Sequence, residues 1–133
     1  MKTKKRRILY VDASVEESMS KISLYDTGNN LTNILELQNI SKSNIAENYA
    51  LLYAILYVVK NNLHNCHILS DNQQSTQNKK IIKIAQDKSI AISWIPREIN
   101  VIADKITKLN TTVKIKEWYI LDMFYNLIMK DEG

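Results

Sequence analysis

Residues 45–59 read IAENYALLYAILYVV, and nearly every position in this stretch is apolar or aromatic. The stretch is too long for one strand, so it predicts a helix that is buried on most of its faces. The pattern before it differs: residues 8–11 form a short apolar run, 18–26 alternate apolar and polar residues, and 31–39 indicate a further strand. We therefore expect three antiparallel strands, joined by turns rich in Gly and Asn, and then a long helix.

The second half of the chain alternates between strand and helix patterns. Residues 66–70 predict a fourth strand, and the polar stretch 72–78 leads into a helix over the apolar residues around Ile81. Residues 90–95 predict a fifth strand, and a helix follows over about residues 98–109. Strands joined by crossover helices run parallel, so the whole pattern predicts a mixed α/β fold.

Length and composition suit one domain, because 133 residues can bury a single core and little more. No apolar run approaches the roughly 20 residues needed to cross a bilayer, and the basic N-terminus leads directly into a strand rather than a signal-peptide core. Cys66 is the only cysteine, so no internal disulfide can form. These features predict a soluble, cytoplasmic protein.

The basic residues are unevenly placed, although the formal net charge of +4 is modest. Residues 2–7 form one basic cluster, and a second cluster consists of Lys79, Lys80, Lys83 and Lys88. Such clusters suit a polyanionic partner, but charge alone is equally consistent with a solvated surface.

Four carboxylates each lie at the end of a predicted element, and the arrangement of these elements would bring the four side chains close together. Asp12 follows the first apolar run, Glu47 opens the long helix, Asp71 ends the fourth strand and Asp104 lies in the helix after the fifth strand. In a sheet whose first and fourth strands are neighbours, Asp12 and Asp71 lie side by side, and the first turn of the helix brings Glu47 over them. Taken together, the four positions favour a shared site over a chance placement of four unrelated acids.

Each carboxylate taken alone also has a structural interpretation. Glu47 with Asn44 as N-cap matches a capping box, and Asp71 suits the N-cap of the helix that follows it. The first acid has no cap or turn to serve unless its strand stops there.

The helix over about residues 98–109 predicts an exposed face of its own. Its apolar stripe consists of Ile99, Ile102, Ala103, Ile106 and Leu109. Asn100 and Asp104, one turn apart, fall on the opposite side, where an ordinary solvated face would also lie.

A cluster of acids has a chemical consequence, because carboxylates within a few ångströms repel strongly and are tolerated mainly when cations neutralise them. Hard oxygen ligands suit Mg²⁺ or Mn²⁺, whereas one cysteine with His64 and His67 is too little for a structural zinc site. In a site with two such ions, one activates water and the other stabilises the leaving 3′-oxygen of a phosphodiester. We therefore expect Mg²⁺ or Mn²⁺ as the occupant, and a site with two such ions would require no nucleophilic side chain.

The order of the acids and the residues around them resemble ribonuclease H. The resemblance covers about residues 8–110, and its most specific motifs are Asn44-Ile45-Ala46-Glu47 and Trp94-Ile95-Pro96-Arg97-Glu98 through Ala103-Asp104. The second motif is similar to the Trp-Val-Pro-Arg-Glu subgroup of the family. The resemblance implies a domain over residues 1–110 with a five-stranded mixed sheet, three antiparallel strands followed by parallel ones, and helices on both faces. It also implies metal-dependent endonucleolytic cleavage of the RNA strand of RNA/DNA hybrids.

The resemblance assigns the site residues as well. It implies that the catalytic and metal-binding acids are Asp12, Glu47, Asp71 and Asp104. Asn44 matches a residue that contacts the hybrid in its minor groove, where 2′-hydroxyls distinguish RNA from DNA. The other substrate-side residues that the motifs suggest are Ser14, Asn72, Arg97 and Asn100.

Departures from the family pattern bear on substrate binding. The interval between Asp71 and Asp104 leaves room for one helix where the family usually has two or three, and the basic substrate-binding protrusion is absent. Ala13 replaces the usual glycine after the first acid. Residues 111–133 predict an extra amphipathic helix, which would cover exposed apolar area on the domain or pair two copies in a homodimer.

Two other functions remain open from the sequence. One is a related enzyme on the same fold, such as a 3′ exonuclease or a resolvase, although proofreading exonucleases usually carry Asp-x-Glu where this chain has Asp12-Ala13-Ser14. The other is a non-catalytic module that binds nucleic acid and retains the acids.

Overall fold

The computed structural model describes residues 6–17, 19–38, 40 and 42–101, which form five strands and three helices. The strands are β1 (Arg7–Glu16), β2 (Met19–Asp26), β3 (Leu31–Gln38), β4 (Cys66–Ser70) and β5 (Ala91–Trp94). The helices are α1 (Ser43–Lys60), α2 (Gln73–Thr76) and α3 (Lys79–Asp87). The helix and the homodimer predicted from residues 111–133 lie outside the described residues, as does Asp104.

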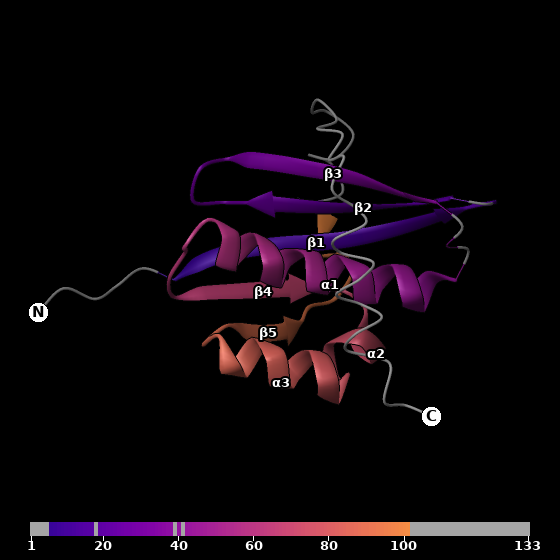
Figure 1. Cartoon of the computed structure of the whole chain (residues 1–133). Coiled ribbons are helices and arrows are strands. Elements are labelled where there is room, and N and C mark those ends of the chain that lie inside the picture. Colours follow the sequence, from indigo (N-terminus) through magenta and orange to yellow (C-terminus); the bar gives the residue numbers. More distant parts are fainter. Residues whose placement is uncertain (1–5, 18, 39, 41, 102–133) are drawn as a thin grey trace, which may run out of the picture.

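One five-stranded sheet organises the molecule, with strand order β3-β2-β1-β4-β5 (Figure 1). β1 and β3 both pair antiparallel with β2, whereas β4 pairs in parallel with β1 and with β5. The predicted mixed sheet is therefore confirmed. The first and fourth strands are neighbours, which is the adjacency that a shared acidic site requires.

β1 is longer than its apolar run suggests. Its pairing with β2 continues without a break from Leu9 opposite Asp26 to Glu16 opposite Met19. The strand continues past the apolar run because β2 satisfies its backbone hydrogen bonds as far as Glu16. Asp12 consequently lies inside the strand.

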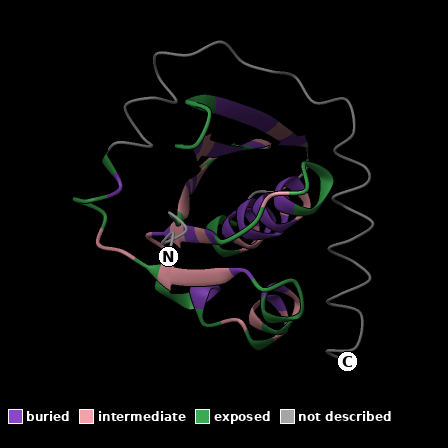
Figure 2. Ribbon diagram, turned by 90° about the vertical axis from the view of Figure 1, so that its left-hand side faces the viewer, coloured by how far each residue is buried: buried purple, intermediate pink, exposed green. Residues whose placement is uncertain are grey.

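The core lies between one face of the sheet and α1. Alternation along the strands places Leu9 and Val11 of β1 beside Ile22 and Leu24 of β2 on this face, all at most 1% exposed. Each such side chain contributes about 1.5–3 kcal/mol of hydrophobic stabilisation. α3 lies on the same face and packs against α1 and β5 (Figures 1 and 2).

α1 is buried on most of its faces, as its composition predicts (Figure 2). It begins at Ser43, and its N-cap is Lys42, whose side chain makes no capping hydrogen bond. The capping-box interpretation of Asn44 and Glu47 is therefore wrong, because the helix starts two residues too early for Asn44 to be its N-cap.

The segment after β4 contains two helix starts where the sequence predicted one. Asn72 accepts a hydrogen bond from the Ser75 N–H and caps the short helix α2, and Asn78 accepts from the first turn of α3. Asp71 is therefore not a capping residue. No helix in the described part of the chain combines the length and the hydropathy that spanning a bilayer requires.

Candidate metal centre

Two acids reach the same edge of the sheet through parallel pairing. β1 and β4 pair in register up to Tyr10 opposite Leu69. Asp12 lies two residues beyond this point in β1, and Asp71 lies two residues beyond it, immediately after β4. Because parallel strands advance together, their carboxyl ends bring both side chains to one place.

Glu47 joins them from the helix layer. α1 runs back across the sheet against the direction of β1 and β4, so its N-terminal turns lie near the ends of these strands (Figure 1). One carboxylate oxygen from each of Asp12, Glu47 and Asp71 lies within 4.8 Å of the others. The structure thus brings three of the four predicted acids together.

The Glu47 carboxylate is buried and incompletely paired. Its side chain is 4% exposed, and its Oε2 atom has no hydrogen-bond partner among the described residues. Burial, together with the negative charges of Asp12 and Asp71, raises the pKa of Glu47 to about 8, although Arg97 acts in the opposite direction. Such a carboxyl is protonated near neutrality unless a cation is bound beside it.

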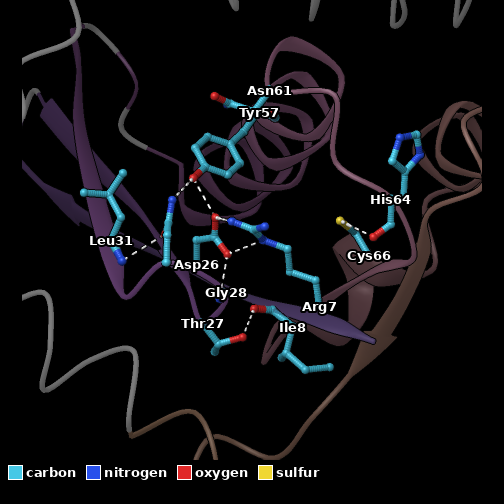
Figure 3. Close-up of polar contacts among 11 residues, drawn as sticks. Arg7, Ile8, Asp26, Thr27, Gly28, Leu31, Tyr57, Asn61, His64 and Cys66 are labelled. Atoms are coloured by element: carbon cyan, nitrogen blue, oxygen red, sulfur yellow. Dashed lines mark hydrogen bonds and ion pairs between the residues drawn. The ribbon is translucent and has the colours of Figure 1, made fainter. Parts of the chain in front are cut away.

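A second buried acid shows how this protein satisfies a carboxylate by itself (Figure 3). Asp26 is fully buried, and it accepts two hydrogen bonds from the Arg7 guanidinium at 2.8 and 2.6 Å and one from the Tyr57 hydroxyl at 2.7 Å. Burial opposes its ionisation, but these bonds and one from the Gly28 N–H outweigh that effect and hold the pKa of Asp26 below its usual value. Among the described residues Glu47 has no such set of donors, and only the backbone hydrogen bond from Ala13 lowers its pKa in this way.

The surroundings of Asp71 restrict its position. Its side chain is 6% exposed, and its backbone oxygen accepts a hydrogen bond from the Trp94 indole at 3.0 Å. The Asp71 Oδ2 atom accepts from Asn100 Nδ2 at 3.2 Å, and the Arg97 guanidinium lies 3.8 Å from the same oxygen. The last residue of β5 and the residues that follow it therefore hold the end of β4 in place.

Asn100 lies on the opposite side from that predicted. Residues 97–100 form a turn, Val101 is helical, and the rest of the helix expected over about residues 98–109 lies outside the described residues. Asn100 is 2% exposed, whereas Ile99 and Val101 are 54% and 38% exposed. The Asn100 amide donates to Asp71 and to the Val11 backbone oxygen at 3.3 Å, and these bonds draw it inward. The solvated face expected for Asn100 and the buried stripe expected for Ile99 are both wrong.

The remaining predicted residues lie around the acids without joining them. Asn44 is exposed in the first turn of α1, and Ser14 is exposed on β1 opposite Lys21. The Asn72 side chain is occupied by its cap on α2. The role of Trp94 as a contact of Asp71 was not predicted, because a hydrogen bond across strand ends leaves no periodic signal in the sequence.

The three acids together fit a hard divalent cation. All three offer oxygen atoms, one from each lies within 4.8 Å of the others, and one Glu47 oxygen is buried with no hydrogen-bond partner in the described part of the chain. Oxygen donors of this kind suit Mg²⁺ or Mn²⁺ and disfavour soft metals. Asp12, Glu47 and Asp71 can therefore hold a metal ion.

Comparison with known proteins shows what this architecture resembles. No protein-family model matches the chain, and no curated protein sequence matches it. Among solved structures, ribonuclease H1 of the archaeon Halobacterium salinarum NRC-1 superposes with a TM-score of 0.58 at 15% identity, over 76% of this chain and 93% of that one. The fold is that of ribonuclease H.

Two further ribonuclease H structures agree. LC11 ribonuclease H1, isolated from compost, has a TM-score of 0.58 at 19% identity, over 75% of this chain and 91% of that one. The same protein in complex with RNA/DNA hybrid has a TM-score of 0.52. The N-terminal ribonuclease H domain of a Mycobacterium tuberculosis protein has a TM-score of 0.56 at 16% identity, over 75% and 88% of the two chains. At these identities the likeness shows the fold, and not the activity.

Proposed function

We propose that this protein is a metal-dependent endonuclease that hydrolyses the RNA strand of RNA/DNA hybrids. The observation that carries the proposal is the convergence of Asp12, Glu47 and Asp71, whose carboxylate oxygens lie within 4.8 Å of one another. The hybrid is the favoured substrate because the chain shares its fold with LC11 ribonuclease H1, which has been solved with RNA/DNA hybrid bound.

The acids hold the ions in this mechanism, with Asp104 as the proposed fourth ligand and Mg²⁺ or Mn²⁺ as the proposed pair of ions. When bound, such ions supply an activated water and stabilise the leaving 3′-oxygen of the phosphodiester. The low exposure of Glu47 and Asp71 keeps solvent away from their oxygens, which strengthens their attraction for a cation.

Arg97 and Asn44 are the proposed contacts to the substrate. The Arg97 side chain is 86% exposed beside Asp71, so its guanidinium can donate to a phosphate that approaches the acids. Asn44 is exposed on α1, three residues before Glu47 and therefore on the same side of the helix. Ser14 and Asn72 complete the proposed substrate-side set, although Asn72 already caps α2. Asn100, which the motifs also suggest for this set, is buried and donates to Asp71 instead.

The decisive experiment uses labelled RNA/DNA hybrid, duplex DNA, duplex RNA and single strands, each with Mg²⁺, Mn²⁺ or a chelator. We expect cleavage of the RNA strand of the hybrid, with internal products, only when a divalent ion is present. Asp71→Asn should lower the rate by at least about 100-fold, because it removes one carboxylate ligand. Asp87→Asn makes the same chemical change at the exposed end of α3 and should leave the rate unchanged.

Other results would assign the protein differently. Release of single nucleotides from an end, or preference for a DNA junction, would identify a related nuclease of the same fold. Binding of hybrid without cleavage under every ion condition would identify a non-catalytic module. Equal activity of the wild type and Asp71→Asn would show that the acidic centre is not the active site.

A further inference from the structure

The two carboxylate oxygens of Asp71 differ in their contacts with other side chains. Among the described residues, both side-chain contacts fall on Oδ2, from Asn100 Nδ2 at 3.2 Å and from Arg97 Nε at 3.8 Å. The Arg97 side chain is 86% exposed, so solvent screens its contact, whereas Asn100 is 2% exposed. The bond from Asn100 is therefore the one that fixes the carboxylate.

The orientation of the Asn100 amide follows from its partners. Its nitrogen lies 3.3 Å from the Val11 backbone oxygen and 3.2 Å from Asp71 Oδ2, and both of these atoms can only accept hydrogen bonds. Val11 immediately precedes Asp12 in β1. One side chain thus links the strand that carries the first acid to the carboxylate of the third acid.

The other end of the Asn100 amide indicates a role beyond stability. Its Oδ1 atom is buried and has no hydrogen-bond partner in the part of the chain that the structure describes. A buried acceptor left without a partner is unfavourable, and functional sites are where proteins retain such groups. Among the described residues, only the nitrogen of the Asn100 side chain is held by hydrogen bonds.

We propose that Asn100 is a positioning residue that holds Oδ2 of Asp71 against β1 and leaves the other Asp71 oxygen directed to the cation. This inference rests on the proposed metal site, and it assigns Asn100 to Asp71 rather than to the substrate. Without Asn100 the carboxylate rotates about its Cβ–Cγ bond, so the cation has to order it on binding. Loss of a group that orients a metal ligand in this way typically lowers metal affinity by about 10–100-fold.

The test measures Mn²⁺ binding to the full chain by the electron paramagnetic resonance signal of free Mn²⁺, in the absence of nucleic acid. Asn100→Leu keeps the approximate size of the side chain and removes the donor, and it should weaken Mn²⁺ binding by about tenfold or more. The matched control is Asn33→Leu, because Asn33 is also buried, at 7% exposure, but lies on β3 at the other side of the sheet. The control should bind Mn²⁺ as the wild type does.

A double-mutant cycle separates positioning from a general structural effect. In an Asp71→Ala background, Asn100→Leu should cause no further loss of Mn²⁺ affinity, because the carboxylate that it positions is gone. The same loss in both backgrounds, or no loss in the wild-type background, would overturn the proposal. If Asn100→Leu does not fold, as judged by circular dichroism, Asn100→Ser serves instead and should show a smaller loss because its hydroxyl can still donate.

Activity provides an independent readout that also separates this inference from the proposed function. With hybrid as substrate, the cleavage rate of Asn100→Leu should be lower than that of the wild type at low Mn²⁺ concentration and should recover at high Mn²⁺ concentration. The rate of a misfolded variant would not recover. Dependence of Mn²⁺ affinity on Asn100 in a protein that cleaves nothing would refute the nuclease and retain the inference. If the protein cleaves hybrid and Asn100→Leu leaves its Mn²⁺ affinity unchanged, the nuclease is retained and the inference is refuted. A wild type that binds no Mn²⁺ would also overturn the inference.

Discussion

Glu47 and Asp26 are both buried carboxylates, yet their surroundings shift their pKa values in opposite directions. Asp26 receives donors from Arg7 and Tyr57, which outweigh its burial and lower its pKa. Glu47 is buried beside two further acids, and its pKa rises to about 8. At the scale of single residues, the protein itself stabilises the negative charge of Asp26, whereas the negative charge of Glu47 needs a bound cation.

Substitution of Glu47 should remove a pH dependence of stability in the metal-free protein. The folded state holds the Glu47 proton up to a pKa of about 8, whereas an unperturbed glutamate loses it near 4.5. Between these values the folded state binds more protons than the unfolded state, so the free energy of unfolding falls as pH rises, by at most about 1.4 kcal/mol per pH unit.

Urea unfolding of the wild type and of Glu47→Gln, with chelator present, measures this effect between about pH 5 and pH 8. Because glutamine does not ionise, the stability of the variant relative to the wild type should increase steadily across this range. His67, whose burial lowers its pKa, titrates in both proteins and cancels in the comparison. A difference that stays constant with pH would contradict the raised pKa of Glu47.

β1 and α1 each contribute side chains to the same two polar clusters, the one around Asp26 and the metal centre. β1 contributes Arg7 to the Asp26 ion pair and Asp12 to the metal centre, while α1 contributes Tyr57 and Glu47 to the same two places. Tyr57 lies ten positions after Glu47 in the helix, which is about 15 Å along the axis. A Cβ at Gly28 would collide with the Arg7 guanidinium, so a larger residue there would require this side chain to shift.

At the scale of these elements, Asp26→Asn should destabilise the fold without weakening the metal centre. The variant leaves the Arg7 guanidinium without its carboxylate, and we expect a loss of about 2 kcal/mol, below the usual cost for a fully buried pair because the Arg7 side chain is 26% exposed. Chemical denaturation measures the loss, and Mn²⁺ titration of the folded variant should match the wild type.

The control for this prediction is Glu36→Gln, which makes the same type of change at a half-buried acid of β3. It should alter the free energy of unfolding by less than about 0.5 kcal/mol, as surface substitutions usually do. Equal losses in the two variants would show that the Asp26 cluster contributes nothing specific.

For the whole molecule, cation binding and folding stability should be coupled. The three acids come from β1, α1 and the end of β4, so an ion that binds them binds the folded state only. Mass action then raises the free energy of unfolding by about 2.7 kcal/mol at a free-ion concentration 100 times the Kd. Calorimetry should therefore show a Tm that rises with Mg²⁺ or Mn²⁺ concentration.

The same experiment on Asp12→Asn should show a much smaller rise in Tm, because one ligand is lost, whereas Asp87→Asn should behave as the wild type. A rise of equal size in all three proteins would indicate non-specific ion binding at the surface. This measurement needs no substrate, so it tests the metal centre independently of any nuclease activity.

Much of this architecture follows from local patterns. The apolar run over residues 45–59 predicts α1, and the alternation before it predicts the antiparallel strands, because burial on one face imposes the period of each element. Crossover helices then require parallel pairing of β4. The resemblance carried by the motifs around Glu47 and Trp94 named the acids, and the structure brings Asp12, Glu47 and Asp71 together.

The sequence by itself thus determined the five strands, α1, the helix around Ile81, their order, and which acids could share a cation. Only the tertiary structure decided that Asn72 rather than Asp71 caps α2, that Asn100 turns inward to Asp71, and that Arg7 satisfies Asp26. Hydrophobic periodicity is a property of neighbouring residues along one element. These polar contacts instead join residues far apart in the chain, and their partners are chosen only when the strands and helices have packed.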